Sequence, residues 1–136
     1  MITATIDFDG TINDHFGGHL NPYKEKVQEM IKKLILDGFD VKIVTRRFGP
    51  ERSKEGSKNE HIIVFDIADK LGIEHSNVHF VNREWKYTKL IELGSNFHLD
   101  DDASDIFNIK IYAKDTIGVQ LKDFSSIEDF YNLCKK

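Results

Sequence analysis

Two carboxylates near the start of the chain, Asp7 and Asp9, have the spacing of a paired acidic site. They belong to the segment Asp-Phe-Asp-Gly-Thr at residues 7–11, directly after an apolar run. Alternation at a strand end sends both carboxylates to the same side, where they repel each other unless a cation lies between them. Oxygen ligands suit Mg²⁺, and Gly10 lets the backbone turn sharply. We favour a metal site over a turn that carries two solvated acids.

A second acidic segment, Asp100-Asp101-Asp102 followed by Asp105, comes after another apolar run. Consecutive acids are costly unless solvent or a metal neutralises them. Taken alone, the segment fits an acidic helix start equally well, because carboxylates favour helix N-termini. In combination with Asp7 and Asp9, a shared metal site becomes the better interpretation.

The elements that must position these acids alternate between strand and helix patterns. Apolar, β-branched runs predict strands at residues 2–8, 39–45, 78–81, 96–99 and 109–113. Helical spacing predicts helices from Pro22 to a stop at Gly38, over 59–71, over 86–93 and at the end of the chain, where Ser125 and Glu128 have capping-box spacing. The helix at 59–71 is the least distinct, since residues 62–65 also fit a strand.

This alternation predicts an α/β fold: one Rossmann-like, three-layer α/β/α domain over residues 1–136 with a mainly parallel five-stranded sheet. Ligands of such sheets bind beyond the carboxyl ends of the strands. Polar side chains follow three of the expected strands there: Asp7 and Asp9, then Thr45, then Asp100 and Asp101. The acids are therefore expected to meet at one edge of the sheet.

These motifs resemble those of the haloacid dehalogenase-like (HAD) phosphatase superfamily. The first motif, Asp-x-Asp-x-Thr after a hydrophobic strand, matches residues 7–11, and the second, a strand ending in Ser or Thr, matches the run that ends at Thr45. The third is a lysine at a helix start, for which Lys86 fits and Lys89 is the rival. The fourth, Asp-Asp with an acid four positions on, matches Asp100, Asp101 and Asp105.

The resemblance implies a Mg²⁺-dependent phosphomonoester hydrolase. Asp7 would be the nucleophile that forms a phosphoaspartate, and Asp9 would be the general acid and base. Thr45 and Lys86 would bind the phosphoryl oxygens. The metal site would comprise Asp7, Asp9 through its backbone carbonyl, Asp101 and Asp105 as support.

Neither gap between motifs has room for a cap domain, so the resemblance implies a capless member with an open site. Residues 46–58 form a basic loop that begins at the site, and this loop favours nucleotides or polynucleotide-terminal phosphates as substrates. Sugar phosphates and phosphoproteins remain alternatives, as does a solvated loop. Further contacts with substrate are expected from Thr11, Arg46, Arg47 and Asp100, although Thr11 is also suited to support its own loop.

Composition narrows the protein class. The chain has 136 residues with a net charge of −4, which argues against a general nucleic-acid coat. The single cysteine, Cys134, excludes an intrachain disulfide, and no basic leader or membrane-length apolar run is visible, so a cytoplasmic protein without membrane contact is expected.

His15 and His19 lack the spacing of a zinc site, and Phe16 between them is a candidate stacking platform.

A different class of protein would use similar residues. Receiver-like signalling modules also place an acid pair, a Thr and a Lys around Mg²⁺, without turnover. Their phosphorylated Asp follows a middle strand, whereas the expected middle strand here ends at Val81-Asn82. The Asp7-x-Asp9 spacing also supplies an acid/base that such modules lack, so we prefer the enzyme.

Overall fold

A computed structural model describes residues 1–55 and 59–136 of the chain. Its five-stranded sheet has the order β3-β2-β1-β4-β5, and every pair of neighbouring strands is parallel. The strands are β1 Thr3–Ile6, β2 Asp40–Thr45, β3 Val78–Phe80, β4 Phe97–Asp100 and β5 Ile117–Gln120. The predicted α/β class is confirmed, and the sheet is parallel throughout.

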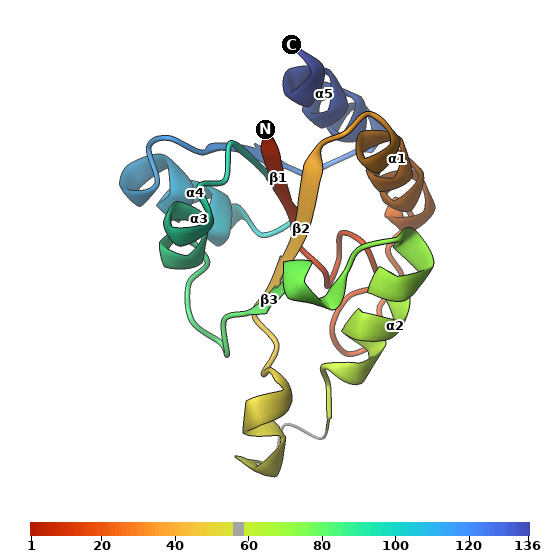
Figure 1. The fold of residues 1–136 in the computed structure, drawn as a ribbon, viewed down its shortest axis with the longest axis vertical. Helices are drawn as coiled ribbons and strands as arrows, with labels where there is room; N and C mark the ends of the chain where they lie inside the picture. The colour runs from red at the N-terminus through yellow and green to blue at the C-terminus, as the bar shows by residue number, and fades with distance from the viewer. Residues whose placement is uncertain (56–58) are drawn as a thin grey trace.

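Helices cover both faces of the sheet (Figure 1). One face carries α1 Lys24–Leu36, α2 Ile62–Leu71 and α5 Phe124–Lys135, and the other carries α3 Tyr87–Leu93 and α4 Ala103–Tyr112. Both faces of the central strands are buried: Ala4 and Ile6 are fully buried on one face of β1, and Thr5 is fully buried on the other. In the described part of the chain, no helix is long and apolar enough to cross a membrane.

The order of the strands creates a crevice beside β1. From β1 the chain moves outward to β2 and β3, and it then returns across the sheet to place β4 on the other side of β1. Strand order therefore reverses between β1 and β4, which is where ligands bind in open α/β sheets. Asp7 follows β1, and Asp100 ends β4.

The expected strand at 109–113 is wrong, because these residues lie in α4 and at its end. Ile109 and Ala113 are buried one helical turn apart, in a small core with Val44 and Leu90. The Asp102 side chain caps this helix by accepting hydrogen bonds from the backbone N–H groups of Ser104 and Asp105. The fifth strand is instead Ile117–Gln120.

Three helix boundaries also differ from the expected ones. The first helix, α1, begins at Lys24 rather than at Pro22. The last helix, α5, takes its capping box from Asp123 and Ser126 rather than from Ser125 and Glu128. The predicted helix over 59–71 is confirmed as α2, which begins at Ile62 and includes residues 62–65, so the alternative of a strand there is wrong. The loop after β2 includes a short 3-10 helix, Pro50–Glu55, and Lys58 of the predicted basic loop lies outside the described residues.

Candidate active site

Asp7 and Asp100 come together at the carboxyl edge of the sheet because β1 and β4 are direct neighbours. The Asp7 backbone N–H continues the ladder by donating to the Leu99 carbonyl at 2.9 Å. Both acidic side chains are buried. They lie in the wall of a hollow of about 440 Å³ whose lining is largely charged: Asp7, Asp9, His15, Phe16, Arg46, Arg47, Arg83, Lys86, Asp100, Asp101, Asp102 and Asp105.

Lys86 joins the two acids. Its side chain is only 2% exposed, and its Nζ lies 2.5 Å from Asp7 Oδ1 and 2.7 Å from Asp100 Oδ2. The residue precedes the first turn of α3, at the position expected from the sequence. The rival lysine, Lys89, instead forms a surface ion pair with Glu92. The structure therefore brings Lys86, and not Lys89, to Asp7.

Burial and crowding of like charges shift the pKa values of this cluster. The pKa of Asp7 is raised well above its usual range, mainly by burial and then by the nearby Asp100 carboxylate. Burial alone would raise the pKa of Asp100 too, but the charge of Lys86 and a hydrogen bond with His98 hold it well below the usual range. Burial would lower the pKa of Lys86, but the surrounding carboxylates raise it. Lys86 is therefore a permanent cation, and its charge favours ionised Asp100 more than ionised Asp7.

Three carboxylates of the site form a group that fits a divalent cation. Asp7, Asp100 and Asp101 each offer a ligand oxygen, and these atoms lie within 4.8 Å of one another. Burial raises the pKa of Asp101 as well as that of Asp7, which indicates that their negative charges lack sufficient compensation. An all-oxygen donor set of this kind suits Mg²⁺. Asp7 and Asp100 both also pair with Lys86, so in this conformation their carboxylates share that cation.

Close packing around Gly10 holds this group together. Gly10 has a positive φ of 76°, and a Cβ atom there would collide with Asp101 Oδ2. The Thr11 hydroxyl donates to Asp7 Oδ2 at 2.9 Å, so Thr11 supports the loop, which was one of its two expected roles. The sequence Gly-Thr after the acid pair thus lets the loop approach Asp101 and orients Asp7.

Asp105 lies beside Lys86 rather than within the three-carboxylate group. Its Oδ2 is 3.8 Å from Lys86 Nζ and 3.7 Å from Arg46 Nε, and this buried oxygen accepts no hydrogen bond within the described residues. Burial raises the pKa of Asp105, while Lys86 opposes that shift. Asp105 therefore faces the buried lysine, and its predicted support of a metal stays a prediction.

Asp9 is engaged by an arginine from the loop after β2. Arg47 donates from Nε to Asp9 Oδ2 at 3.0 Å and from Nη2 to Asp9 Oδ1 at 2.7 Å. Its remaining Nη1 donates to the Glu60 carbonyl at 2.7 Å. Asp9 is not one of the three carboxylates whose oxygens lie within 4.8 Å of one another, and in this conformation both of its oxygens accept from Arg47. Arg47 was expected to bind substrate, and in this conformation it binds Asp9.

Thr45 and Arg46 follow β2 at the same edge. Thr45 is fully buried, and its Oγ1 accepts from the Arg47 backbone N–H at 3.3 Å. It is not among the residues that line the hollow, and its expected contact with phosphoryl oxygens stays a prediction. Arg46 does line the hollow, and its guanidinium lies 4.3 Å from the centre of the Trp85 ring.

Sequence reasoning missed two residues of the site, His98 and Arg83. His98 is fully buried in β4, with Nε2 2.8 Å from Asp100 Oδ2 and Nδ1 2.8 Å from Thr5 Oγ1. His98 could have been predicted from the sequence, since a residue two positions before Asp100 on a strand points to the same face of the sheet as Asp100. Arg83, which pairs with Glu60 at 2.7 Å, follows β3 and had no distinguishing pattern.

Residues 14–21 form a flap over one side of the hollow. Asp14 holds its ends together by accepting from the Asn21 backbone N–H at 2.9 Å and pairing with Lys24 at 2.8 Å. Within the flap, His15 Nδ1 lies 3.6 Å from Asp101 Oδ2. The Phe16 ring lies between the guanidinium groups of Arg47 and Arg83, at 4.8 and 5.3 Å. Phe16 is thus partly occupied as a cation–π partner.

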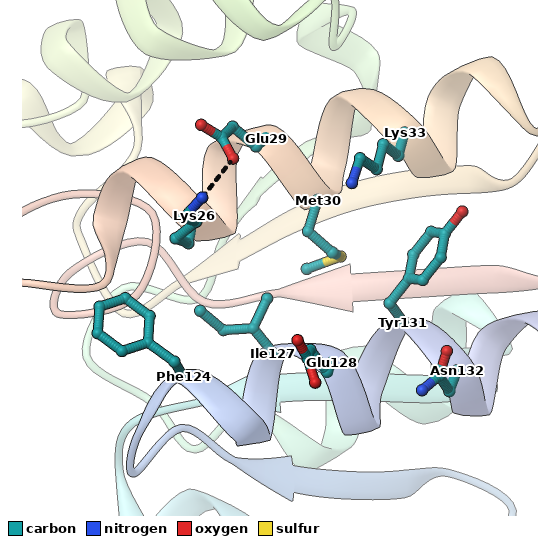
Figure 2. A pocket seen from close by; sticks show the side chains of 9 residues that line it. All are labelled: Lys26, Glu29, Met30, Lys33, Phe124, Ile127, Glu128, Tyr131 and Asn132. Atoms are coloured by element: carbon teal, nitrogen blue, oxygen red, sulfur yellow. Dashed lines mark hydrogen bonds and ion pairs between the residues drawn. The ribbon is translucent and has the colours of Figure 1, made fainter.

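Another hollow, of about 460 Å³, lies between α1 and α5 and away from the carboxyl edge of the strands (Figure 2). Figure 2 shows that its charged side chains come from the exposed faces of the two helices, where Lys26 pairs with Glu29 at 3.3 Å. Surface pairs of this kind are weak and do not converge on a ligand. The candidate active site is therefore the hollow at the sheet edge.

Comparison with known proteins gives no family to which this chain can be assigned. No protein family model matches it, and no curated protein matches its sequence. A proposal of function therefore depends on the chemistry of the site.

Substitutions in the acidic segment test the metal site. If the three-carboxylate group binds Mg²⁺, Asp101→Ala is expected to raise the Mg²⁺ concentration needed for any activity at least about tenfold, because it would remove a ligand. Asp102→Ala serves as the control, since Asp102 caps α4 and is expected to cost about 1 kcal/mol of stability with little change in Mg²⁺ requirement. Activity is measured against Mg²⁺ concentration after EDTA treatment. A larger metal effect at Asp102 would mean that the ligand pair is shifted by one residue.

Proposed function

We propose that this protein is a Mg²⁺-dependent phosphomonoester hydrolase of the HAD-like type that acts through a phosphoaspartate on Asp7. The observation that carries the proposal is the buried contact of Lys86 with both Asp7 and Asp100, beside Asp101. Burial of the Lys86 side chain, which is 2% exposed, costs free energy because the ammonium and its carboxylate partners lose their hydration. Buried charged groups of this kind cluster at functional sites.

The proposed reaction has two steps. An oxygen of Asp7 attacks phosphorus, the bond from phosphorus to the ester oxygen breaks, and Asp9 gives a proton to that leaving oxygen. Water then attacks phosphorus while Asp9 takes its proton, and the bond to Asp7 breaks to release inorganic phosphate. The Lys86 ammonium stabilises the negative charge on the phosphoryl oxygens in both steps.

The cation contributes electrostatics. Mg²⁺ bound by Asp7, Asp101 and the Asp9 carbonyl would offset the repulsion between the phosphate and the acidic cluster. The raised pKa values of Asp7 and Asp101, caused mainly by burial and then by the Asp100 carboxylate, support this requirement because a bound cation would favour the ionised forms. Asp7 must be ionised to attack phosphorus, so the charge compensation also prepares the nucleophile.

The ion pair of Arg47 with Asp9 must open during catalysis. A carboxylate that accepts two charged hydrogen bonds has no proton to give. Phosphate is also a bidentate partner for a guanidinium, so a bound substrate offers Arg47 an alternative partner. We expect substrate binding to draw Arg47 from Asp9 to the phosphate, which would couple release of the acid to the arrival of substrate.

Replacement of Asp9 is expected to lower the rate of hydrolysis by an amount that depends on the leaving group of the substrate. Asp9→Asn should slow the hydrolysis of alkyl phosphates by roughly 10²–10⁴-fold, because alkoxide leaving groups need a proton. Aryl oxides leave more readily without a proton, so the rate of phosphoaspartate formation from aryl phosphates should fall less. The measurement is the single-turnover rate for one ester of each class, with Asp14→Asn in the flap as a control for loop damage. Equal slowing of both esters would assign Asp9 a structural role.

A receiver-like or otherwise non-catalytic phosphate-binding module is the second candidate, and the Arg47–Asp9 ion pair is the observation that favours it. Such a module would bind Mg²⁺ and become phosphorylated on Asp7 without turnover. A hydrolysis screen with and without Mg²⁺ separates the two functions. It should cover nucleotides, sugar phosphates, a phosphopeptide, and phosphorylated DNA and RNA ends. Mg²⁺-dependent multiple turnover of any of these esters supports the enzyme, and stable phosphorylation without turnover supports the module.

A further inference from the structure

A shallow apolar hollow of about 500 Å³ lies beside the active site, between the segment that precedes α3 and the start of α4. Its lining consists of Trp85, Ala103, Ser104, Phe107 and Asn108. Two large aromatic rings are exposed there, since Trp85 is 44% exposed and Phe107 is 62% exposed. Exposed aromatic residues that share one hollow are typical of binding surfaces.

This aromatic hollow is linked to the candidate active site by Arg46. Trp85 is adjacent in sequence to Lys86, and Ser104 is adjacent to Asp105. Arg46 connects the two regions, because it lines the active-site hollow while its guanidinium stacks on the Trp85 ring. A ligand with its phosphate at Asp7 would therefore extend past Arg46 onto Trp85 and Phe107.

The chemistry of the lining selects the kind of leaving group. Phe107 offers a flat apolar face on which a planar ring can stack, and so does the part of the Trp85 ring that Arg46 does not cover. The Asn108 amide has both a donor and an acceptor for the polar edge of such a ring. Arg46 adds a positive charge between the ring and the phosphate. A sugar or glycerol group is strongly hydrated and gains little from these faces. The combination of phosphate, linker and planar heterocycle is that of a nucleotide.

We propose that the aromatic hollow binds the base of a nucleoside phosphate whose phosphate group occupies the site at Asp7. The inference rests on the proposed function for the position of the phosphate, and it adds the substrate class. A free mononucleotide and the terminal nucleotide of a nucleic acid share this chemistry.

Trp85 is the only tryptophan in the chain, so its fluorescence reports directly on the hollow. The test titrates the Asp7→Asn protein, in Mg²⁺, with a nucleoside monophosphate, a phosphorylated oligonucleotide or glycerol phosphate. Asp7→Asn prevents turnover during the measurement. Saturable quenching by one or both nucleotide ligands, with no quenching by glycerol phosphate, is the expected result. The ligand that binds more tightly shows whether the hollow takes a free mononucleotide or the terminal nucleotide of a nucleic acid.

A matched pair of variants on α4 completes the test. Phe107→Ala should weaken nucleotide binding by roughly tenfold, the loss of one stacking contact. Ile111→Ala removes an exposed apolar side chain from the same helix outside the hollow, and it should leave binding unchanged. Absence of saturable quenching, equal quenching by glycerol phosphate, or equal effects of the two variants would overturn the inference.

Failure of this inference can be distinguished from failure of the proposed function. Mg²⁺-dependent hydrolysis of glycerol phosphate without nucleotide quenching would leave the phosphatase intact and remove the base site. Nucleotide quenching that depends on Phe107, without hydrolysis of any ester by the wild-type protein, would retain the base site and remove the enzyme.

Discussion

Asp7→Asn is expected to abolish hydrolysis and, at neutral pH without metal, to raise thermal stability. An amide cannot attack phosphorus, so the rate should fall by roughly 10⁴-fold or more. Stability should rise by about 1 kcal/mol, because an ionised carboxylate is removed from a site that burial and Asp100 make unfavourable for it. Enzyme assays with the best ester from the hydrolysis screen and thermal unfolding in EDTA measure the two effects.

The stability gain should depend on pH in a definite direction. The pKa of Asp7 is raised in the folded protein, so the wild-type fold binds this proton more tightly than the unfolded chain does. Wild-type stability therefore increases as pH falls through the raised value toward the usual pKa of an aspartate, and the advantage of the Asp7→Asn variant shrinks over the same range. Asp66→Asn on the exposed side of α2 is the control and should change neither quantity. Unchanged activity in Asp7→Asn would contradict the covalent mechanism.

Lys86→Met should have the largest effect on stability. The methionine fits the buried space but leaves Asp7 and Asp100 without their shared cation. Removal of one partner from a buried ion pair typically costs about 3–5 kcal/mol. Activity should be lost as well, because no other cation of the described residues lies between these two acids. Chemical denaturation in EDTA and activity in Mg²⁺ measure the two losses.

The cause of this instability can be checked by its dependence on pH and metal. Without Lys86 the pKa values of both acids should increase, so the variant should regain stability as pH is lowered from neutral and when Mg²⁺ is added. Lys89→Met removes a lysine of the same helix whose partner, Glu92, is on the surface, and it should cost less than about 1 kcal/mol. Equal stability losses in the two variants would show that Lys86 has no special role.

The sequence alone was sufficient for the parallel sheet and for the position of the acids, because both follow from local patterns. Asp7 and Asp100 each end an apolar strand, and parallel strands bring such ends together. The misassigned strand at 109–113 has a physical cause as well. Its apolar residues alternate as in a strand, but Ile106, Ile109 and Ala113 also lie on one helical face, and the Asp102 cap favours the helix.

Long-range partners could not be predicted from local patterns. The contact of Arg47 with Asp9 joins two loops, and either arginine after Thr45 was equally suited to bind substrate. The same holds for Trp85, whose exposure beside Phe107 depends on the packing of α3 against α4. In the proposed mechanism these contacts would govern the release of Asp9 and the fit of the leaving group, so the structure adds most to the proposal of substrate.

Direct detection of the phosphoaspartate tests the central claim. The Asp9→Asn protein is mixed with an aryl phosphate and Mg²⁺, quenched in acid within one turnover, digested and analysed by mass spectrometry. Asp9→Asn should slow release of the phosphoryl group, so the account predicts one added phosphoryl group on the peptide that contains Asp7, removable by hydroxylamine and absent when Asp7 is also replaced by Asn. Release of one equivalent of aryl alcohol with no phosphoryl group on that peptide would contradict the account.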